Sequence, residues 1–262
     1  MTEAVSMASL FDLHGKEALI IGSGGIGGIL AQGLGDFGAR VRCADIDEAT
    51  AVRVAADVTN RGGEASALRL DVTDEDDVGR TRDRFPDLDV VVLTAAMNVR
   101  KRMVDLTSDE FRRVVRLNLE GSFFALRTFG AAMVARGAGS FIIFSSIRAQ
   151  VVEPGQGVYA ATKAGVLQLV RTAAAEFGAS GVRVNAIAPG VVDTPLTSTI
   201  KADEGWYQAY AQKPALGRWA RPEELVGATV FLASDASTYV TGSYLVVDGG
   251  WLAVDGRFTP RL

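Results

Sequence analysis

Cysteine and histidine are nearly missing from this chain of 262 residues, which contains one of each, Cys43 and His14. A single cysteine excludes an intramolecular disulfide and a thiolate cluster for zinc. A single histidine argues against a histidine metal site and against a serine–histidine catalytic triad. We therefore expect no metal, and we expect Cys43 to act as a small buried hydrophobe and His14 as a loop residue.

Long apolar runs and an excess of basic charge are also missing. No stretch reaches the roughly 18 apolar residues of a membrane span, and 27 Lys and Arg stand against 31 Asp and Glu, for a net charge of -4. Such a chain offers no electrostatic footprint for nucleic acid or an anionic membrane, so we expect neither partner. Residues 1–12 lack the basic flank and apolar core of a targeting segment, which predicts a cytoplasmic protein.

Short β-rich runs alternate with longer helical patterns along the whole chain. Seven strands separated by helices predict an α/β fold with a parallel sheet covered on both faces. Nothing resembling a linker or repeat interrupts the alternation, so we expect a single doubly wound Rossmann domain over residues 1–262, with ligands at the carboxyl ends of its strands. The predicted strands are 18–21, 40–44, 67–70, 90–93, 141–144, 182–185 and 245–247.

Local signals support several of the intervening helices. Thr107 and Glu110 have the spacing of a capping box, and Pro222 suits the first turn of a helix. Residues 156–178 predict one long helix that is apolar around most of its circumference. Such a helix is usually buried on more than its own domain's face, so we expect a homo-oligomer with a tetramer as the favoured form.

A glycine-rich loop, Gly22-Ser-Gly-Gly-Ile-Gly-Gly28, lies directly between the first predicted strand and the first predicted helix. Glycines let the backbone turn tightly and approach a pyrophosphate, whose charge the helix N-terminus favours. The pattern Gly-x-Gly-x-x-Gly is weak evidence alone, but Asp45 ends the second strand about 20 residues on, as in dinucleotide sites. We expect a dinucleotide here; the alternative is a tight structural turn.

Asp45 also bears on which dinucleotide is bound. Its carboxylate suits the ribose hydroxyls of NAD and would repel the 2'-phosphate of NADP, so NAD is predicted and NADP is less favoured. Arg40 and Arg42 point the other way, since an arginine at this edge could bind a phosphate. Asp71 and Val72, after the third strand, suit an adenine contact or a plain strand-to-helix cap.

Tyr159 and Lys163 have helical spacing, which places an ammonium beside a phenol. A phenol has an ordinary pKa of about 10 and is a poor base at neutral pH. A fixed positive charge favours the phenolate and moves its pKa toward the range useful for proton transfer. The pair is either a proton-transfer device or an ordinary pair on a helix surface.

These pieces, taken in order, resemble the short-chain dehydrogenase/reductase family over almost the whole length. Asn118 in Leu-Asn-Leu-Glu-Gly, Ser146 in Phe-Ser-Ser, Tyr159 and Lys163 resemble the family's catalytic tetrad. Segment 183–190 with 191–194 resembles its nicotinamide-side loop, and 231–235 through 247–250 resembles its C-terminal signature.

The resemblance implies an oxidoreductase that moves a hydride between a carbinol carbon and a nicotinamide. Tyr159 would exchange the hydroxyl proton, Ser146 would hold the reacting oxygen, Lys163 would lower the tyrosine pKa and bind the ribose, and Asn118 would anchor a proton-relay water. Ser145 is the alternative serine, although the family spacing selects Ser146. The predicted cofactor-binding residues are Gly22, Ser23, Gly25, Ile26, Gly27, Asp45, Ile46, Asp71, Val72, Ala95, Ala96, Tyr159, Lys163, Pro189, Gly190, Val192 and Thr194.

Two departures from the family pattern are visible. The glycine loop is one residue shorter than usual, and Leu93-Thr-Ala-Ala96 replaces the usual Asn-Asn-Ala-Gly. Hydrogen bonds of the missing asparagine are therefore either absent or supplied by Thr94. The methyl group of Ala96 should narrow the approach to the cofactor.

The substrate is the least defined part of the site. Residues 195–217 resemble the family's variable lid, and the motifs 10–16, 217–219 and 247–251 resemble the sugar-acid branch, such as gluconate 5-dehydrogenase. Arg100 and Arg102 follow the fourth strand and could bind a carboxylate, or belong to a solvated loop. We expect an NAD-dependent dehydrogenase of a sugar acid or related polyol, with Arg100, Arg102, Ser146 and Tyr159 at the substrate.

Two alternatives remain open at this point. One is a 3-ketoacyl or other ketone reductase that uses NADPH, which Asp45 disfavours. The other is a catalytically silent dinucleotide sensor or scaffold, which the complete tetrad disfavours. Segment 251–262 either caps a neighbouring subunit's site or is a frayed end.

Overall fold

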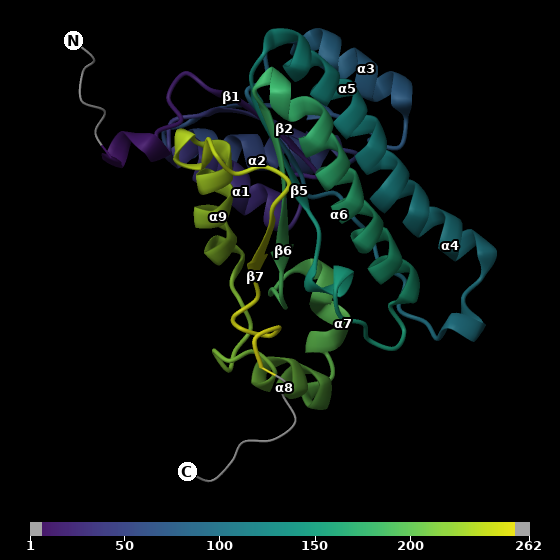
Figure 1. Cartoon of the computed structure of the whole chain (residues 1–262). Helices are drawn as coiled ribbons and strands as arrows, with labels where there is room; N and C mark the ends of the chain where they lie inside the picture. The colour runs from purple at the N-terminus through teal and green to yellow at the C-terminus, as the bar shows by residue number, and fades with distance from the viewer. Residues whose placement is uncertain (1–6, 255–262) are drawn as a thin grey trace.

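A seven-stranded parallel sheet forms the centre of the molecule (Figure 1). The structure is a computed structural model and describes residues 7–254. Its strand order is β3-β2-β1-β4-β5-β6-β7, and every neighbouring pair is parallel. The strands are β1 (Glu17–Ile21), β2 (Arg40–Asp45), β3 (Glu64–Arg69), β4 (Val90–Leu93), β5 (Gly139–Phe144), β6 (Val182–Pro189) and β7 (Tyr244–Val247).

Helices cover both faces of this sheet, so its strands are apolar on both sides. Along β1, Ala18 and Ile20 face one core and Leu19 and Ile21 face the other, because successive side chains of a strand alternate. The first core also contains α1 (Ile26–Asp36), α2 (Glu48–Asn60) and α9 (Val226–Ala233). The second contains α3 (Glu75–Arg84), α5 (Gly121–Arg136) and α6 (Gly157–Phe177). The predicted single Rossmann-like fold with seven parallel strands is confirmed.

The remaining helical segments are short. α4 (Ser108–Val115) begins at the predicted capping box, in which the Glu110 amide donates to Thr107 Oγ1 (3.2 Å) and the Thr107 amide donates to the Glu110 carboxylate (2.9 Å). A π-helical turn, η3 (Arg116–Glu120), joins α4 to α5. The others are η1 (Met7–Phe11), η2 (Met103–Asp105), η4 (Ile147–Ala149), η5 (Gly178–Ser180), η6 (Pro195–Thr197), α7 (Ser198–Lys201), α8 (Glu204–Gln212), η7 (Pro222–Leu225) and η8 (Asp235–Ser237).

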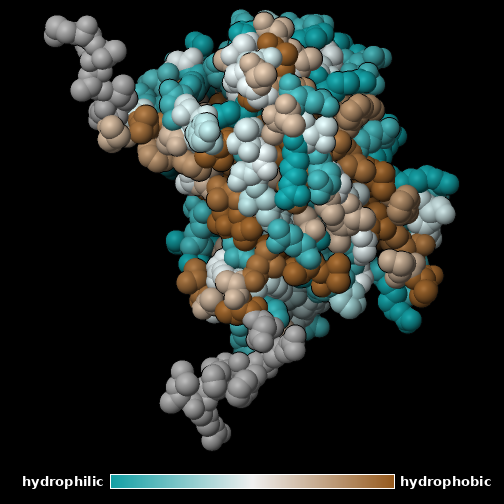
Figure 2. Space-filling view, viewed as in Figure 1, coloured by the Kyte–Doolittle hydropathy of each residue, from teal (hydrophilic) through white to brown (hydrophobic). Residues whose placement is uncertain are grey.

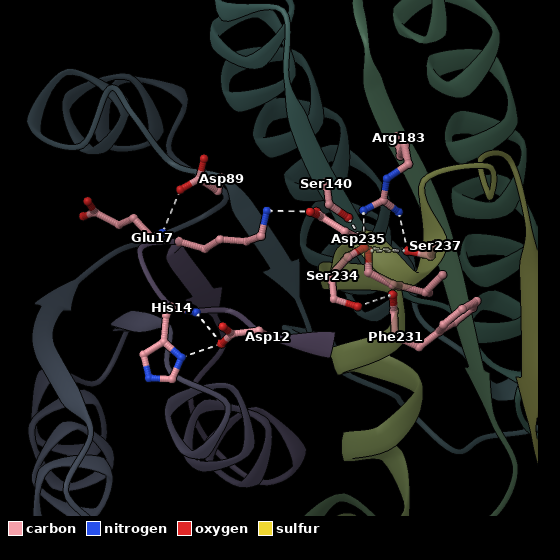
Figure 3. A network of polar contacts seen from close by, with 12 residues as sticks. Asp12, His14, Glu17, Asp89, Ser140, Arg183, Phe231, Ser234, Asp235 and Ser237 are labelled. Carbon is pink, nitrogen blue, oxygen red and sulfur yellow. Dashed lines mark hydrogen bonds and ion pairs between the residues drawn. The ribbon is translucent and has the colours of Figure 1, made fainter. Parts of the chain in front are cut away.

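A polar network ties the amino ends of β5 and β6 to the turn after α9 (Figure 3). Arg183, near the start of β6, donates to Ser237 Oγ (2.7 Å), and Ser140, near the start of β5, donates to the Leu232 carbonyl (2.7 Å). Lys16 Nζ, which precedes β1, contacts Asp235 at 3.1 Å. The amino ends of β5 and β6 are thus covered by protein contacts, whereas the cavities described below lie at the carboxyl ends of the strands.

The two rare residues have ordinary structural settings. Cys43 is buried in β2, and this burial raises the pKa of its thiol to about 12. His14 is an exposed loop residue hydrogen-bonded to Asp12 (Figure 3). Within residues 7–254, no helix combines the length and apolarity needed to cross a membrane.

A third, smaller apolar cluster lies beyond the carboxyl ends of the strands. It joins Ile147 of η4 and Ile200 of α7 to the aromatic side chains of Tyr210, Trp219 and Trp251. The Tyr210 and Trp219 rings stack with centroids 5.7 Å apart, and the Tyr210 and Trp251 rings meet edge-on at 5.3 Å. Much of the predicted lid, 195–217, is therefore held to the body by aromatic packing.

Candidate active site

The glycine loop lies at the carboxyl end of β1, and steric contacts require its glycines. A Cβ on Gly22, whose φ is 91°, would lie 2.6 Å from the Ala95 amide nitrogen. A Cβ on Gly27 would lie 2.0 Å from the Gly22 carbonyl oxygen. Gly25 precedes α1 without a side-chain cap. The Gly27 amide donates to the Gly24 carbonyl (3.1 Å), so it is the other amides of the first turn that are available to an anion. The loop therefore fits a pyrophosphate.

Thr94 takes over a role that the missing asparagine would have had. Its hydroxyl donates to the Gly22 carbonyl at 2.6 Å, and its amide donates to the Ile21 carbonyl at 2.9 Å. These bonds join the end of β4 to the glycine loop. Of the two possibilities left by the sequence, replacement by Thr94 is the one observed.

Asp45 lies at the end of β2, beside the glycine loop, and lines the cavity next to that loop. One carboxylate oxygen accepts from the Gly24 amide (3.0 Å) and the other accepts from the Asp47 amide (3.1 Å). Asp71, at the neighbouring strand end, accepts from both the amide and the hydroxyl of Thr73. Acidic groups thus flank the adenosine end of the cavity.

Arg42, which the sequence left as a possible phosphate ligand, is occupied elsewhere. Its Nε contacts Glu17 at 2.6 Å and its Nη1 donates to Ser66. Neither Arg40 nor Arg42 lines the cavity beside the glycine loop.

Two adjoining cavities contain most of the predicted site residues. One, beside the glycine loop, is lined by Gly22, Gly25, Ile26, Asp45, Ile46, Asp71, Val72, Ala95, Ala96 and Thr194. The other, beyond β5, is lined by Ile26, Ala96, Arg100, Ser146, Tyr159, Lys163, Pro189, Gly190, Val192 and Thr194. We call them the dinucleotide cavity and the substrate cavity. Ile26, Ala96 and Thr194 line both, so the cavities meet there.

Four predicted residues do not line either cavity. Ser23 is fully buried beneath the loop, where its hydroxyl donates to the Ala44 carbonyl (2.9 Å). Gly27 is set back against the Gly22 carbonyl. Arg102 is 81% exposed and faces Asp105. Asn118 lies behind the substrate cavity, at the π-helical turn.

Asn118 joins two parts of the site through its side-chain amide. The amide accepts from the Met97 backbone nitrogen (2.8 Å) and donates to the Met97 carbonyl (2.9 Å) and to Thr162 Oγ1 (3.2 Å). The π-helical turn directs this side chain inward, as such turns often do at functional sites. Asn118 thus fixes the segment after β4 against α6.

Tyr159 and Lys163 lie on one face of α6 at the substrate cavity. Lys163 is buried, its Nζ donates to the Phe144 carbonyl (2.7 Å), and burial lowers its pKa to about 8. Its Nζ lies 5.6 Å from the centre of the Tyr159 ring. The Ser145 hydroxyl donates to the Lys163 carbonyl (3.0 Å). Of the two serines, Ser146 is the one whose hydroxyl bonds to the Tyr159 phenol.

The pKa of Tyr159 differs from the sequence-based expectation. Burial raises it, while the Ser146 hydroxyl and the charges of Arg100 and Arg148 act in the opposite direction. The Lys163 ammonium is directed to the Phe144 carbonyl. The positive charges that favour the phenolate come instead from two arginines of the substrate cavity.

Comparison with known proteins agrees with this geometry. The family model described as Enoyl-(Acyl carrier protein) reductase matches residues 20–252. The chain is 41% identical to a cis-4-hydroxycyclohexanecarboxylate dehydrogenase from Sinomonas cyclohexanicum, covering 91% of this chain and 97% of that protein. It is 33% identical to a gluconate 5-dehydrogenase from Gluconobacter oxydans (strain 621H), covering 94% and 98%. The chain belongs to the short-chain dehydrogenase/reductase family.

Solved structures of this family superpose closely. A gluconate 5-dehydrogenase from Burkholderia cenocepacia J2315, solved in complex with NADP and tartrate, has a TM-score of 0.92 at 33% identity, covering 95% of this chain and 100% of that one. The predicted resemblance, including its sugar-acid branch, is confirmed. This short-chain dehydrogenase is an oxidoreductase of CH–OH groups with a dinucleotide cofactor.

Sequence reasoning missed part of the substrate cavity of this dehydrogenase. Arg148, which is 8% exposed, contacts Glu153 Oε2 (2.6 Å) and the Tyr210 hydroxyl (3.2 Å), and Gln156 also bonds to Glu153. Asn98 is hydrogen-bonded in turn to Gln156. Arg148 follows the end of β5, so the rule that ligands bind at the carboxyl ends of strands could have identified it.

Proposed function

We propose that this short-chain dehydrogenase oxidises a secondary alcohol that carries a carboxylate, a sugar acid or related polyol, with NAD as the acceptor. One observation carries the substrate class. Arg100 lines the substrate cavity and its buried Nη1 has no hydrogen-bond partner within the described residues. A buried guanidinium nitrogen without a partner is costly, and a substrate carboxylate would satisfy it.

A contact with an aromatic ring holds the Arg100 guanidinium in place. Its guanidinium carbon lies 5.5 Å from the centre of the Trp206 ring, which holds the group by a cation–π contact. The relatives from Sinomonas cyclohexanicum and Gluconobacter oxydans act, by their names, on compounds that carry a carboxylate. Arg148 is less available, because Glu153 already balances its charge.

NAD is preferred in this proposal because of Asp45. A carboxylate at the end of β2 accepts from ribose hydroxyls and repels a 2'-phosphate. Relatives solved with NADP, such as the Burkholderia cenocepacia enzyme, make the choice of cofactor a direct test. Preference for NADPH in the reducing direction would favour the alternative, a 3-ketoacyl or other ketone reductase.

The proposed chemistry assigns one task to each residue of the tetrad. When bound, the nicotinamide supplies the hydride acceptor. Tyr159 takes the hydroxyl proton as phenolate, and Ser146 holds the reacting oxygen. Lys163 binds the nicotinamide ribose, and Asn118 anchors a relay water.

The assembly and location complete the proposal. A homo-oligomer, with a tetramer as the favoured form, is supported by the long apolar helix α6 and by exposed apolar side chains nearby, such as Phe111 of α4 and Phe123 of α5. Figure 2 shows apolar surface on the side of the molecule where α4 and α6 lie. Residues 195–217 are proposed as the lid. The cytoplasmic location stays a prediction, to be checked by cell fractionation.

Arg100 can be tested against a neighbouring arginine. We expect R100M to lower kcat/KM for gluconate, relative to its uncharged counterpart glucitol, by about 10- to 100-fold, since a charge-assisted bond is lost. R102M is the matched control, because Arg102 is exposed outside the cavity, and it should leave this ratio unchanged. Equal losses on both compounds in R100M, or activity confined to uncharged alcohols, would reject the carboxylate role.

A further inference from the structure

Two buried side-chain atoms of the described residues lack a hydrogen-bond partner, and both belong to the substrate cavity. One is Arg100 Nη1, a donor, and the other is Asn98 Oδ1, an acceptor. Buried polar groups are almost always paired, so two unpaired atoms of opposite type in one cavity indicate a ligand that carries both complements. Arg100 needs an anionic acceptor, and Asn98 needs a donor.

The orientation of the Asn98 amide follows from a chain of hydrogen bonds. A carboxylate only accepts, so Gln156 must present its Nε2 to Glu153. Its Oε1 is then directed to Asn98, and it accepts from Asn98 Nδ2 at 2.9 Å. This leaves Oδ1 as the Asn98 atom without a hydrogen-bond partner, on a residue that lines the substrate cavity. The acceptor at Asn98 is therefore set by the carboxylate of Glu153, two hydrogen bonds away.

Glu153 is itself held in place. Its Oε2 accepts from Arg148 Nη2 (2.6 Å) and from the Tyr210 hydroxyl, besides Gln156. The Arg148 guanidinium lies 5.3 Å from the centre of the Trp251 ring. Gln156 is 4% exposed, so the relay runs through the interior. An amide flip at Gln156 would place a carbonyl against the carboxylate, which opposes any reversal of the chain.

We propose that Asn98 Oδ1 accepts a hydrogen bond from a substrate hydroxyl other than the one oxidised, and that Gln156 and Glu153 position it to do so. This inference rests on the proposed function and deepens it: the substrate is an acid with at least two hydroxyl groups. An acid with a single, reacting hydroxyl leaves Asn98 Oδ1 unpaired. Asn98 would then make the enzyme prefer polyhydroxy acids to monohydroxy acids as substrates.

The test is a cycle that combines substrate and protein changes. The rate of NADH formation is measured with gluconate, with each deoxy derivative that keeps the oxidised hydroxyl, and with 4-hydroxycyclohexanecarboxylate, for wild type and Asn98→Leu. In wild type we expect one deoxy derivative to lose about 10- to 100-fold in kcat/KM relative to gluconate, because it leaves Asn98 Oδ1 buried and unpaired. In Asn98→Leu gluconate and that derivative should be turned over with equal kcat/KM.

Gln156→Met tests the positioning role. It removes the bond to Asn98 but leaves Asn98 in place, so the amide is free to turn. We expect the discrimination between gluconate and the same deoxy derivative to fall in this variant, with NADH affinity unchanged. Full discrimination in Gln156→Met would overturn the relay.

The outcomes separate this inference from the proposed function. Turnover of gluconate by wild type, with a loss in Asn98→Leu that is equal for gluconate and all deoxy derivatives, would overturn the Asn98 contact alone. Preference of wild type for 4-hydroxycyclohexanecarboxylate over gluconate would overturn it as well, while leaving the carboxylate specificity intact. Lack of turnover of every acid would contradict the proposed function, and this inference with it.

Discussion

At the scale of single residues, the substrate cavity obtains its positive charge from arginines more than from the lysine. Lys163 is buried, its pKa falls to about 8, and its ammonium is bonded to the Phe144 carbonyl. Arg100 and Arg148 place two guanidinium groups in the lining of the same cavity. Both favour the phenolate of Tyr159 against the effect of its burial. The proposed proton transfer at Tyr159 would therefore depend on the charge of Arg100, the residue proposed to bind the substrate carboxylate.

Tyr159→Phe isolates the proposed proton transfer. The substitution removes only the hydroxyl, so we expect NADH to bind with unchanged affinity in a fluorescence titration. The turnover number should fall by about 100- to 10,000-fold, the range that a positioned general acid–base contributes. Retention of turnover in this variant would remove Tyr159 from the mechanism.

Burial of Lys163 also predicts how stability depends on pH. The folded protein releases this proton near pH 8, whereas the unfolded chain holds it until about pH 10.5, the ordinary value. Between these values the unfolded state binds more protons, so this group makes the free energy of unfolding rise with pH. Lys163→Met should remove that contribution. Denaturant unfolding at pH 7.5 and 9.5 measures it, and an identical pH slope in wild type and variant would contradict the burial argument.

Sequence spacing was sufficient to find Tyr159 and Lys163, but it could not find the network around Glu153. The links in this network depend on which atom, oxygen or nitrogen, each side-chain amide directs to its neighbour. That choice depends on the packing around η4. The pKa of Tyr159 is likewise raised by burial, and burial cannot be read from the spacing of residues in a sequence. Arg102 looked equivalent to Arg100 in the sequence, yet only Arg100 faces the cavity.

At the scale of elements, the glycine loop and α1 form one unit with the ends of β1 and β4. Thr94 bonds to Gly22, and Gly22 packs against Ala95, so the shortened loop is supported from β4. The central strands β1, β4 and β5 were predictable because both faces of the sheet are covered, which makes most of each one an apolar run. The ends of other strands were less so: β3 begins at Glu64, three residues before the predicted start, and β6 extends to Pro189.

Two glycine-to-alanine substitutions compare a glycine of the loop with an ordinary glycine of a helix. Gly27→Ala places a methyl 2.0 Å from the Gly22 carbonyl oxygen, so we expect a loss of at least ~2 kcal/mol in stability and of measurable dinucleotide binding. Gly79→Ala is the control: it lies within α3 with open space around it, and should stabilise by ~0.5–1 kcal/mol. Thermal unfolding and an NADH titration report both, and a tolerated Gly27→Ala would show that the loop does not need this glycine.

Asp45 at the end of β2 is expected to decide the cofactor. Asp45→Asn keeps an oxygen for the Gly24 amide but removes the negative charge. We expect kcat/KM with NADP to rise by about tenfold relative to NAD, the effect of ~1.4 kcal/mol of lost repulsion. Initial rates with both cofactors measure the ratio. An unchanged ratio would mean that Asp45 does not face the ribose.

At the scale of the whole molecule, the two edges of the sheet have different tasks. The network around Arg183 and Asp235 covers the amino ends of β5 and β6, while the dinucleotide and substrate cavities lie at the carboxyl edge. The alternation of strands and helices was enough to predict this division, because ligands of doubly wound folds bind at the carboxyl edge. The aromatic cluster of Tyr210, Trp219 and Trp251 was not predictable, since these residues are brought together from separate segments.

We propose that hydroxy acids are oxidised by NAD in the cavities at the carboxyl edge of the sheet. The most direct measurement is the rate of NADH formation by the wild-type protein from gluconate and from glucitol, each at equal NAD concentration. The account predicts a kcat/KM for the acid that exceeds that for the uncharged polyol by about tenfold or more, as expected for a charge-assisted contact. Equal values, or turnover of the polyol alone, would contradict it.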